Sequence, residues 1–261
     1  MTTENLIPTV RTTPSKLDFA LAVLKEWPDA NKPNIGVLWA HFAGETGEGK
    51  YCWNWNLGNV KKVKGDGFNY VSLRGVWEGF KLKDLDGDGD IDDDDKQLLI
   101  DRLVKTGLWS RDDNRDHAIA VGKDKVSMIA SVNNPASWFR AYDNLNVGMH
   151  FYINMKRNPA SRYASAWPFI VGGMPKSYAY ELGAKRYYTA NRDVYARSMQ
   201  KHFDKWMTDS AYDDAIFEMQ ETKRDLELAN KPIIENSGAI VRTLRYPGLP
   251  WVDDNDEDDN S

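Results

Sequence analysis

Two segments of the chain hold residue types at spacings that suit chemistry. The first covers residues 84–95 and reads DLDGDGDIDDDD, with eight aspartates in twelve residues. Aspartates at positions one, three and five, a glycine at position six and an acid at position twelve match a twelve-residue calcium-binding loop. Eight carboxylates this close together repel one another unless a divalent cation neutralises them. The segment therefore predicts a structural Ca²⁺ as a cofactor.

Six aspartates of this loop are candidate calcium ligands, and position seven would contribute its backbone carbonyl. Ile91, at position eight, is expected to anchor the loop to a core. The last ligand is an aspartate where the usual pattern has glutamate, so it would bind with one oxygen or draw the loop tighter. A solvated acidic loop without an ion is the plainer alternative. The predicted ligands are Asp84, Asp86, Asp88, Asp90, Asp92 and Asp95.

The second segment covers residues 41–61 and reads HFAGETGEGKYCWNWNLGNVK. Apolar residues at i, i+3, i+4 and i+7 from Ile35 to Phe42 predict a helix that enters this segment. At 100° per residue, Glu45 falls at the edge of the apolar stripe, near the last turn of that helix. A carboxyl group there borders the core while still facing a cleft.

The elements around these two segments are expected to be mostly helical. Residues 14–28 form an amphipathic pattern that ends at Pro28. Glycines punctuate short β-type runs in residues 51–80, NVKKVK and FNYVSL, which predict a small hairpin or sheet. A helix should follow the acidic loop, over 96–109. From Trp138 to about Lys231 the pattern is mostly helical, with breaks at Asn158-Pro159 and Gly172-Gly173.

Charge and composition narrow the class of protein. The net charge is -5, but 14 of the 39 acidic residues lie in 84–95 and 251–261, which leaves 25 against 34 Lys and Arg. A basic body suits an anionic polymer such as the cell wall, and no nucleic-acid motif accompanies it. No apolar run reaches the length of a membrane span, and the one cysteine, Cys52, excludes an intramolecular disulfide framework. It is expected to be buried rather than nucleophilic.

Four short segments resemble those of the lysozyme-like superfamily, especially its glucosaminidase branch of peptidoglycan hydrolases. Glu45-Thr46-Gly47 is similar to an E-[ST]-G segment that holds the acid glutamate at a helix end. Residues 56–61, NLGNVK, are similar to an N-L-x-x-[IV]-K segment. Residues 139–143, FRAYD, resemble an F-R-x-Y-[DS] segment that opens a helix behind the cleft. Tyr187-Tyr188-Thr189 with Tyr195 resembles a Y-x-T…Y segment whose first tyrosine lines the active site. The acidic loop, in addition, resembles one repeat of a dockerin.

The resemblance implies a set of site residues. Glu45 would be the catalytic acid, with Phe42, Trp53 and Trp55 as an apolar wall that raises its pKa. Glu78, in VWEGF, resembles the family's second glutamate, and Glu48 and Asp66 are alternatives. Tyr187 would line the active site and is included among the catalytic candidates. Candidates for substrate binding are Asn59, Tyr142, Trp53, Trp55 and Tyr188.

The expected reaction is cleavage of a β-1,4 bond between N-acetylglucosamine and N-acetylmuramic acid, with glucosaminidase specificity first. Muramidase or lytic transglycosylase activity on the same fold is the close alternative, and chitinase activity a more distant one. The alternative of another class is a non-catalytic, calcium-stabilised cell-wall-binding or phage structural module. The expected partner is bacterial peptidoglycan, met by a monomer that neither binds nucleic acid nor inserts into a membrane.

The expected fold is α+β and predominantly α: a lysozyme-like domain with a small β lobe and an inserted EF-hand-like loop. Residues 1–81 and 135–232 would form the catalytic domain, 82–134 the insertion, and 233–261 an extension with a disordered acidic tail. The N-terminus has no apolar stretch typical of a signal peptide. The protein is therefore expected to be made in the cytoplasm and delivered to the wall, either as a phage lysis or virion-associated enzyme or as an injected effector.

Overall fold

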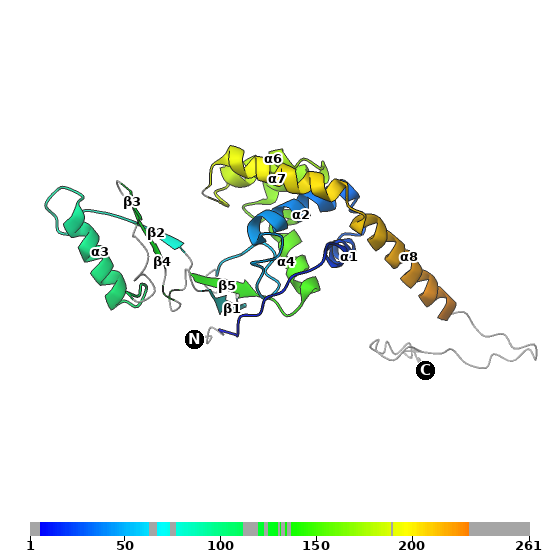
Figure 1. Cartoon of the computed structure of the whole chain (residues 1–261), viewed down its shortest axis with the longest axis horizontal. Coiled ribbons are helices and arrows are strands. Elements are labelled where there is room, and N and C mark those ends of the chain that lie inside the picture. Colours follow the sequence, from blue (N-terminus) through cyan, green and yellow to red (C-terminus); the bar gives the residue numbers. More distant parts are fainter. Residues whose placement is uncertain are drawn as a thin grey trace, which may run out of the picture. The chain divides into compact units, whose positions relative to one another are not determined.

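The structure is a computed structural model, and it describes residues 6–62, 67–73, 77–111, 120–122, 125–129, 131, 134, 137–188 and 190–229. Helices dominate it, with short antiparallel sheets, so the predicted α+β, mainly α, class is confirmed. The helices are α1 (Lys16–Glu26), α2 (Lys32–Thr46), α3 (Asp93–Lys105), α4 (Leu145–Arg157), η2 (Ala164–Ala166), α5 (Trp167–Val171), α6 (Pro175–Ala184), α7 (Arg192–Met207) and α8 (Ala211–Ala229) (Figure 1).

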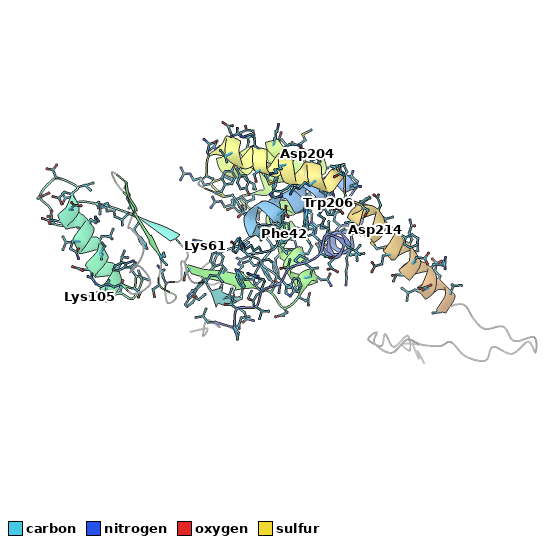
Figure 2. All side chains as sticks on the ribbon, in the orientation of Figure 1. Phe42, Lys61, Lys105, Asp204, Trp206 and Asp214 are labelled. Carbon is cyan, nitrogen blue, oxygen red and sulfur yellow. The ribbon has the colours of Figure 1, made fainter. Side chains whose placement is uncertain are left out.

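Helix α2 is the central helix of the helical core. Its N-terminus is fixed by a capping box between Asn31 and Asn34, and the Asn34 amide also donates to the carbonyls of Ile170 and Val171. Helix α7 packs along it, and Trp39 of α2 stacks on Trp206 of α7 with ring centroids 5.6 Å apart. These buried aromatic contacts fix the middle of α2 against the end of α7, and Figure 2 shows the side chains around them.

A two-stranded sheet lies beside this core, and it joins segments far apart in the sequence. Strand β1 (Asn69–Ser72) pairs antiparallel with β5 (Trp138–Ala141), with Ser72 opposite Trp138. The other edge of β5 meets residues 60–62, where Lys61 forms a bridge with Phe139. A small hairpin or sheet was predicted from NVKKVK and FNYVSL. A small sheet is present, but the described residues of the two runs do not pair with each other and contact β5 instead. The FRAYD segment is also a strand, and helix α4 begins only at Leu145.

The ends of the insertion meet at this sheet. Beyond the β1–β5 pair, β2 (Trp77–Lys81) pairs with β4 (Lys125–Ile129), which also pairs with β3 (Ala120–Gly122). The insertion was predicted to begin at residue 82. Residues 77–81, just before this boundary, form β2 and pair with β4, which lies inside the predicted insertion. A separate apolar cluster holds this lobe together and contains Leu82, Ile100, Leu103, Trp109 and Val126.

Helix α8 is the last helix in the described part of the chain. The boundary of a second compact unit falls at Asp213, within α8, and α8 carries exposed apolar side chains, among them Phe217 and Leu228. The predicted extension and acidic tail, residues 233–261, lie outside the described residues. Within the described part of the chain, no helix is both long and apolar enough to cross a membrane.

Candidate functional site

Glu45 lies on the last turn of α2, and the Glu45-Thr46-Gly47 segment explains how the helix ends there. The Thr46 hydroxyl donates to the carbonyl of Phe42 at 2.6 Å and accepts the amide hydrogen of Gly49 at 2.9 Å. Gly47 takes a left-handed conformation with φ of 58°, which glycine adopts without steric cost. The chain therefore turns sharply just after Glu45, and the carboxyl group is held at the helix end.

The NLGNVK segment forms the loop that faces this helix end. The Asn56 amide donates to the carbonyls of Val60 and Arg140, each at 2.9 Å, and its oxygen accepts the Val60 amide hydrogen at 2.8 Å. Asn59 has a φ of 48° and donates its side-chain amide to the Glu45 carbonyl at 2.5 Å. Left-handed non-glycine residues cost about 1–3 kcal/mol each and cluster at functional sites. The loop is therefore held against Glu45 by side-chain hydrogen bonds.

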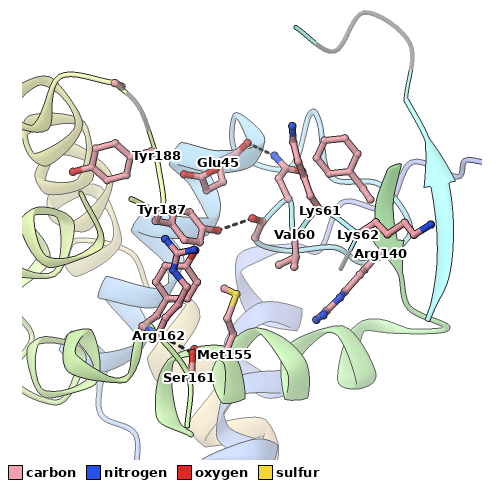
Figure 3. Close-up of a pocket in the computed structure, with 15 residues that line it drawn as sticks. Glu45, Val60, Lys61, Lys62, Arg140, Met155, Ser161, Arg162, Tyr187 and Tyr188 are labelled. Carbon is pink, nitrogen blue, oxygen red and sulfur yellow. Dashed lines mark hydrogen bonds between the residues drawn. The ribbon is translucent and has the colours of Figure 1, made fainter. Parts of the chain in front are cut away.

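A cavity of about 710 Å³ opens beside Glu45 and this loop (Figure 3). Its size is typical of pockets that hold a small organic ligand. The Tyr187 hydroxyl donates to the Gly58 carbonyl at 2.6 Å, and Tyr188 lies on the same side. Of the predicted site residues, Glu45, Asn59, Tyr187 and Tyr188 line the cavity together. Its cationic lining residues are Lys61, Lys62, Arg140 and Arg162.

The surroundings of Glu45 favour its protonated form. Its side chain is only 19% exposed, and burial raises the pKa of the carboxyl group. Two effects oppose this rise in pKa. The Tyr195 hydroxyl donates to Glu45 Oε1 at 2.5 Å, and the positive charge of the buried Lys156 favours the carboxylate. Burial is the largest of the three effects, so Glu45 keeps its proton to a higher pH than an exposed glutamate does.

A buried group of polar rings lies behind Glu45. His41 is fully buried, and its Nε2 lies 4.0 Å from Glu45 Oε1. Its Nδ1 meets the hydroxyls of Tyr152 at 2.9 Å and Tyr178 at 3.2 Å. Burial, and then the charge of Lys156, lower the pKa of His41 well below its ordinary value. The imidazole of His41 therefore favours its neutral form, and its Nε2 has no hydrogen-bond partner among the described residues.

A buried lysine, Lys156, contacts this group of rings. It is fully buried, donates from Nζ to the carbonyl of Tyr152 at 2.7 Å, and lies over the Tyr152 ring. Burial lowers the pKa of this lysine well below its ordinary value, while Glu45 raises it. A buried ammonium group is costly, so its place beside the candidate acid calls for a functional reason.

Three of the predicted binding residues lie outside the described lining of the cavity. Trp53 packs against the Val71–Phe139 cluster and under the guanidinium of Arg11. Trp55 has a φ of 57° and its backbone lies against Gly148. Tyr142 is buried and stacks on Phe151 with centroids 5.3 Å apart. The wall beside Glu45 was expected from Phe42, Trp53 and Trp55. The described contacts there include Tyr195, which donates to Glu45, and Tyr188, which stacks on Tyr195 at 3.8 Å.

The candidates for a second carboxylate take different places. The backbone of Glu78 lies in β2, opposite Met128 of β4, and its side chain is outside the described part of the structure, as is all of Asp66. Glu48 is half exposed and pairs with His202 and Lys205, each at 3.2 Å. Among the described residues that line the cavity, Glu45 is the only carboxylate.

Several site residues were not predicted from the sequence. Tyr195 was noted only as the end of a motif, although it is the group that contacts Glu45 directly. Lys61 and Arg140 also stood inside recognised segments, as the last residue of NLGNVK and the second of FRAYD. Lys156 and Arg162 had no sequence signal, because a lysine or arginine on a helix or turn is ordinarily solvated.

The acidic loop forms a compact turn whose carboxylates converge. Single carboxylate oxygens of Asp84, Asp86 and Asp88 all lie within 4.8 Å of one another, on exposed side chains that could hold a metal ion. The two Asp84 oxygens accept the amide hydrogens of Gly87 at 2.6 Å and Gly89 at 3.1 Å. Gly89 has a φ of 97°, as the sixth position of a calcium loop requires.

The remaining predicted ligands have other roles in the described geometry. Asp92 caps α3 through the amide hydrogens of Asp94 and Asp95. Asp95 is buried, and its side chain accepts the amide hydrogens of Leu85 and Asp92. Asp90 is exposed. Ile91 is 47% exposed, so the expectation that it anchors the loop to a core is wrong.

Cys52 is fully buried, with its sulfur 3.7 Å from the Thr12 hydroxyl oxygen. Burial raises the pKa of the thiol to about 11, which keeps it protonated and unreactive near neutral pH. The expected burial of Cys52 is therefore confirmed. Comparison of the chain with protein-family models, with curated proteins and with solved structures finds no match.

Proposed function

We propose that this protein cleaves the glycan strands of bacterial peptidoglycan, with Glu45 as the general acid. The observation that carries the proposal is the position of Glu45. Its largely buried side chain, with a raised pKa, faces a cavity of about 710 Å³. Glycosidic bond cleavage needs such a carboxyl group, because the leaving sugar oxygen must receive a proton. The preferred bond is the β-1,4 link that a glucosaminidase cuts between N-acetylglucosamine and N-acetylmuramic acid.

The hydrogen bonds of Glu45 suit this role. Tyr195 donates to Oε1, which leaves Oε2 to carry the proton toward the cavity. Transfer of that proton to the glycosidic oxygen breaks the bond to the anomeric carbon, and the sugar ring becomes positively charged. The resulting carboxylate is stabilised by Tyr195 and by the charge of Lys156, and it then accepts a proton from the attacking water.

A second candidate reaction is lytic transglycosylation. Since Glu45 is the only carboxylate among the described lining residues, the positive charge on the sugar has no second carboxylate in that set to stabilise it. An enzyme of this kind forms an anhydro sugar by attack of the sugar's own hydroxyl, and one acid residue is enough. If the reaction is a hydrolysis, Glu78 is the proposed second carboxylate, and Tyr187 and Asn59 contact the reacting sugar.

We further propose that the acidic loop holds one Ca²⁺. Asp84, Asp86 and Asp88 fit it, because hard oxygen ligands at this spacing suit calcium. Bound there, the ion would neutralise the clustered carboxylates and stabilise the loop before α3. Asp90, Asp92 and Asp95 complete the proposed set, which requires the carboxylates of Asp92 and Asp95 to exchange backbone contacts for the ion.

The site and the insertion suit a lysozyme-like enzyme that acts on the wall as a monomer, either from a phage particle or as an effector. A non-catalytic wall-binding module is the rival from another class. The test is digestion of purified peptidoglycan, with and without a calcium chelator, followed by borohydride reduction and mass spectrometry of the products. Reduced N-acetylglucosamine ends are expected. Reduced muramic acid ends would assign a muramidase, anhydro ends a transglycosylase, and no soluble glycan in calcium would contradict the proposal.

A further inference from the structure

One ring nitrogen of His41 faces the candidate acid and has no partner of its own. His41 lies on α2, one turn before Glu45, and its side chain is fully buried. Its Nε2 has no hydrogen-bond partner among the described residues and lies 4.0 Å from Glu45 Oε1. A buried polar atom without a partner is costly and calls for an explanation. Its effect on Glu45 depends on whether this nitrogen carries a hydrogen.

The Tyr152 hydroxyl determines which nitrogen of His41 carries the hydrogen. The hydroxyl oxygen lies 2.8 Å from the Leu38 carbonyl oxygen and 2.9 Å from His41 Nδ1. A hydroxyl has one hydrogen to donate and a carbonyl can only accept, so this hydrogen goes to Leu38 and Nδ1 must donate in the second contact. Burial lowers the pKa of His41 well below its ordinary value, so the ring is neutral near neutral pH. A neutral imidazole has a single N–H, and Nε2 is therefore a bare acceptor.

The other polar groups around the ring do not satisfy Nε2. The Tyr178 hydroxyl lies 3.2 Å from Nδ1, on the other side of the imidazole. Tyr187 packs its ring against His41, but its hydroxyl donates to a backbone carbonyl. Nζ of Lys156 donates to the backbone carbonyl of Tyr152. Among the described groups, the candidate acid is therefore the polar group that Nε2 faces.

Charge in this buried group comes from its lysine and its acid. Burial raises the pKa of each tyrosine around them, so these rings stay neutral: Tyr152, Tyr178, Tyr187 and Tyr195. The charge of Lys156 favours the carboxylate of Glu45. A bare Nε2 acts in the opposite direction, because the negative end of the imidazole dipole then points at Glu45 Oε1. In a buried site such a contact disfavours the carboxylate and favours the protonated carboxyl.

We propose that His41 is a positioning residue for the candidate acid: its bare Nε2, fixed in that state by the Tyr152 hydroxyl, disfavours the Glu45 carboxylate and so keeps a proton on the acid. The use of that proton in catalysis rests on the proposed function, whereas the state of His41 does not. At 4.0 Å the contact is too long for a hydrogen bond, and Tyr195 already donates to the same oxygen. The proton is therefore carried by Oε2, the oxygen that the proposed reaction uses.

Nuclear magnetic resonance of protein labelled with ¹⁵N in histidine and ¹³C at the glutamate carboxyl tests this inference. The ¹⁵N signals distinguish a ring nitrogen that carries a hydrogen from a bare one, and the ¹³C signal follows the titration of Glu45. In the native protein, His41 should have a protonated Nδ1 and a bare Nε2. The Glu45 carboxyl should titrate above the range of an ordinary glutamate. A hydrogen on Nε2 in the native protein overturns the inference.

Tyr152→Phe removes the hydroxyl that fixes this state and keeps both the ring and the backbone carbonyl that Lys156 contacts. The Tyr178 hydroxyl can then donate to Nδ1. The hydrogen of His41 should therefore move to Nε2, where the Glu45 carboxylate accepts it. The titration of Glu45 should shift to lower pH. Tyr178→Phe is the matched control, because it also removes one hydroxyl but leaves the Tyr152 contact, so both signals should stay close to those of the native protein.

If Tyr152→Phe does not fold, His41→Asn takes its place. The asparagine amide can donate to Tyr152 as Nδ1 does, and it leaves no acceptor at the position of Nε2, so Glu45 should again titrate at lower pH. A Glu45 titration that is unchanged in the variant, or that shifts equally in Tyr178→Phe, overturns the inference. The proposed function fails separately, if the native protein releases no glycan, because neither signal depends on activity.

Discussion

The hydroxyl of Tyr195 donates to Oε1 of Glu45 at 2.5 Å, across 150 positions of the sequence. The bond joins the start of α7 to the end of α2, two helices that pack along each other. It holds one carboxyl oxygen in place and leaves the other for the substrate. It also favours the carboxylate, so it limits how far burial raises the pKa of Glu45.

Replacing Tyr195 with phenylalanine tests this contact. Without the hydroxyl, the pKa of Glu45 should rise further, and kcat should fall about tenfold because the carboxyl is less well oriented. The pH profile of kcat/KM should show its alkaline limb at higher pH than in the native protein. Tyr180→Phe is the matched control, since the Tyr180 hydroxyl donates to Asp193 Oδ1 at 2.7 Å and Tyr180 does not line the cavity. An unshifted alkaline limb in Tyr195→Phe would contradict this role.

The activity should depend on pH through Glu45 itself. Because the pKa of Glu45 is raised in the folded state, the general acid stays protonated above the range of an ordinary glutamate, and activity should fall as pH rises through the raised value. The same shift affects stability. The protonated form favours folding, so this contribution is full below the ordinary glutamate pKa and is lost as pH rises through the folded value. Initial rates and chemical denaturation, both measured across pH, check the two effects.

Lys156→Met should stabilise the protein while altering the acid. Burial lowers the pKa of Lys156, so the neutral amine favours folding: that contribution is full above the ordinary lysine pKa and is lost as pH falls through the folded value. Removing the group should therefore raise the free energy of unfolding at neutral pH, because an amine that is costly to bury in its charged form is replaced by an apolar side chain. The substitution also removes a positive charge that lowers the pKa of Glu45. The alkaline limb of the pH profile of kcat/KM should therefore move to higher pH.

Denaturant titration and pH profiles of the same variant measure both effects. A matched substitution at the exposed Lys201 should change neither. An unshifted limb in Lys156→Met would show that Lys156 does not act through Glu45, and a loss of stability would contradict the predicted stabilisation.

Calcium should bind to the acidic loop with one ion per chain. Asp84→Asn with Asp88→Asn removes two of the three converging carboxylates and should abolish binding in calorimetry. Asp94→Asn is the control. It removes one negative charge, as each of the other two substitutions does, but Asp94 is exposed and stands outside the predicted ligand set. Calcium should also raise the melting temperature of the native chain, since it binds only the folded loop. Binding unaffected by the double substitution would contradict this assignment.

The sequence predicted the local features of this protein better than the distant ones. Helix α2 and the position of Glu45 near its end follow from a 3.6-residue pattern and from Gly47, which are properties of neighbouring residues. The breaks at Asn158 and Gly172 were likewise predicted, because capping and glycine act locally. The calcium loop is also a local pattern, and its three leading aspartates do converge.

Features that depend on distant packing were missed. A small hairpin or sheet was predicted for residues 51–80, but the partner of β1 is β5, and the inserted lobe lies between them in the sequence. Nothing in a β-type run states which strand it will pair with. The tyrosine wall of Glu45 comes from the segment after α6 and from α7, so no spacing within residues 41–61 could reveal it. Ile91 was misjudged for a similar reason, since the core of its lobe is formed by α3 and β4 without it.

The most direct test of the central claim compares native protein with Glu45→Gln and Glu48→Gln on purified peptidoglycan in calcium. Each variant replaces one carboxylate by an amide of the same size, and the control glutamate is exposed and paired with Lys205. The release of soluble glycan is measured together with sedimentation of the protein with the wall. The account predicts that Glu45→Gln binds the wall but releases at least a hundredfold less glycan, while Glu48→Gln stays close to the native protein. Undiminished release by Glu45→Gln would contradict it.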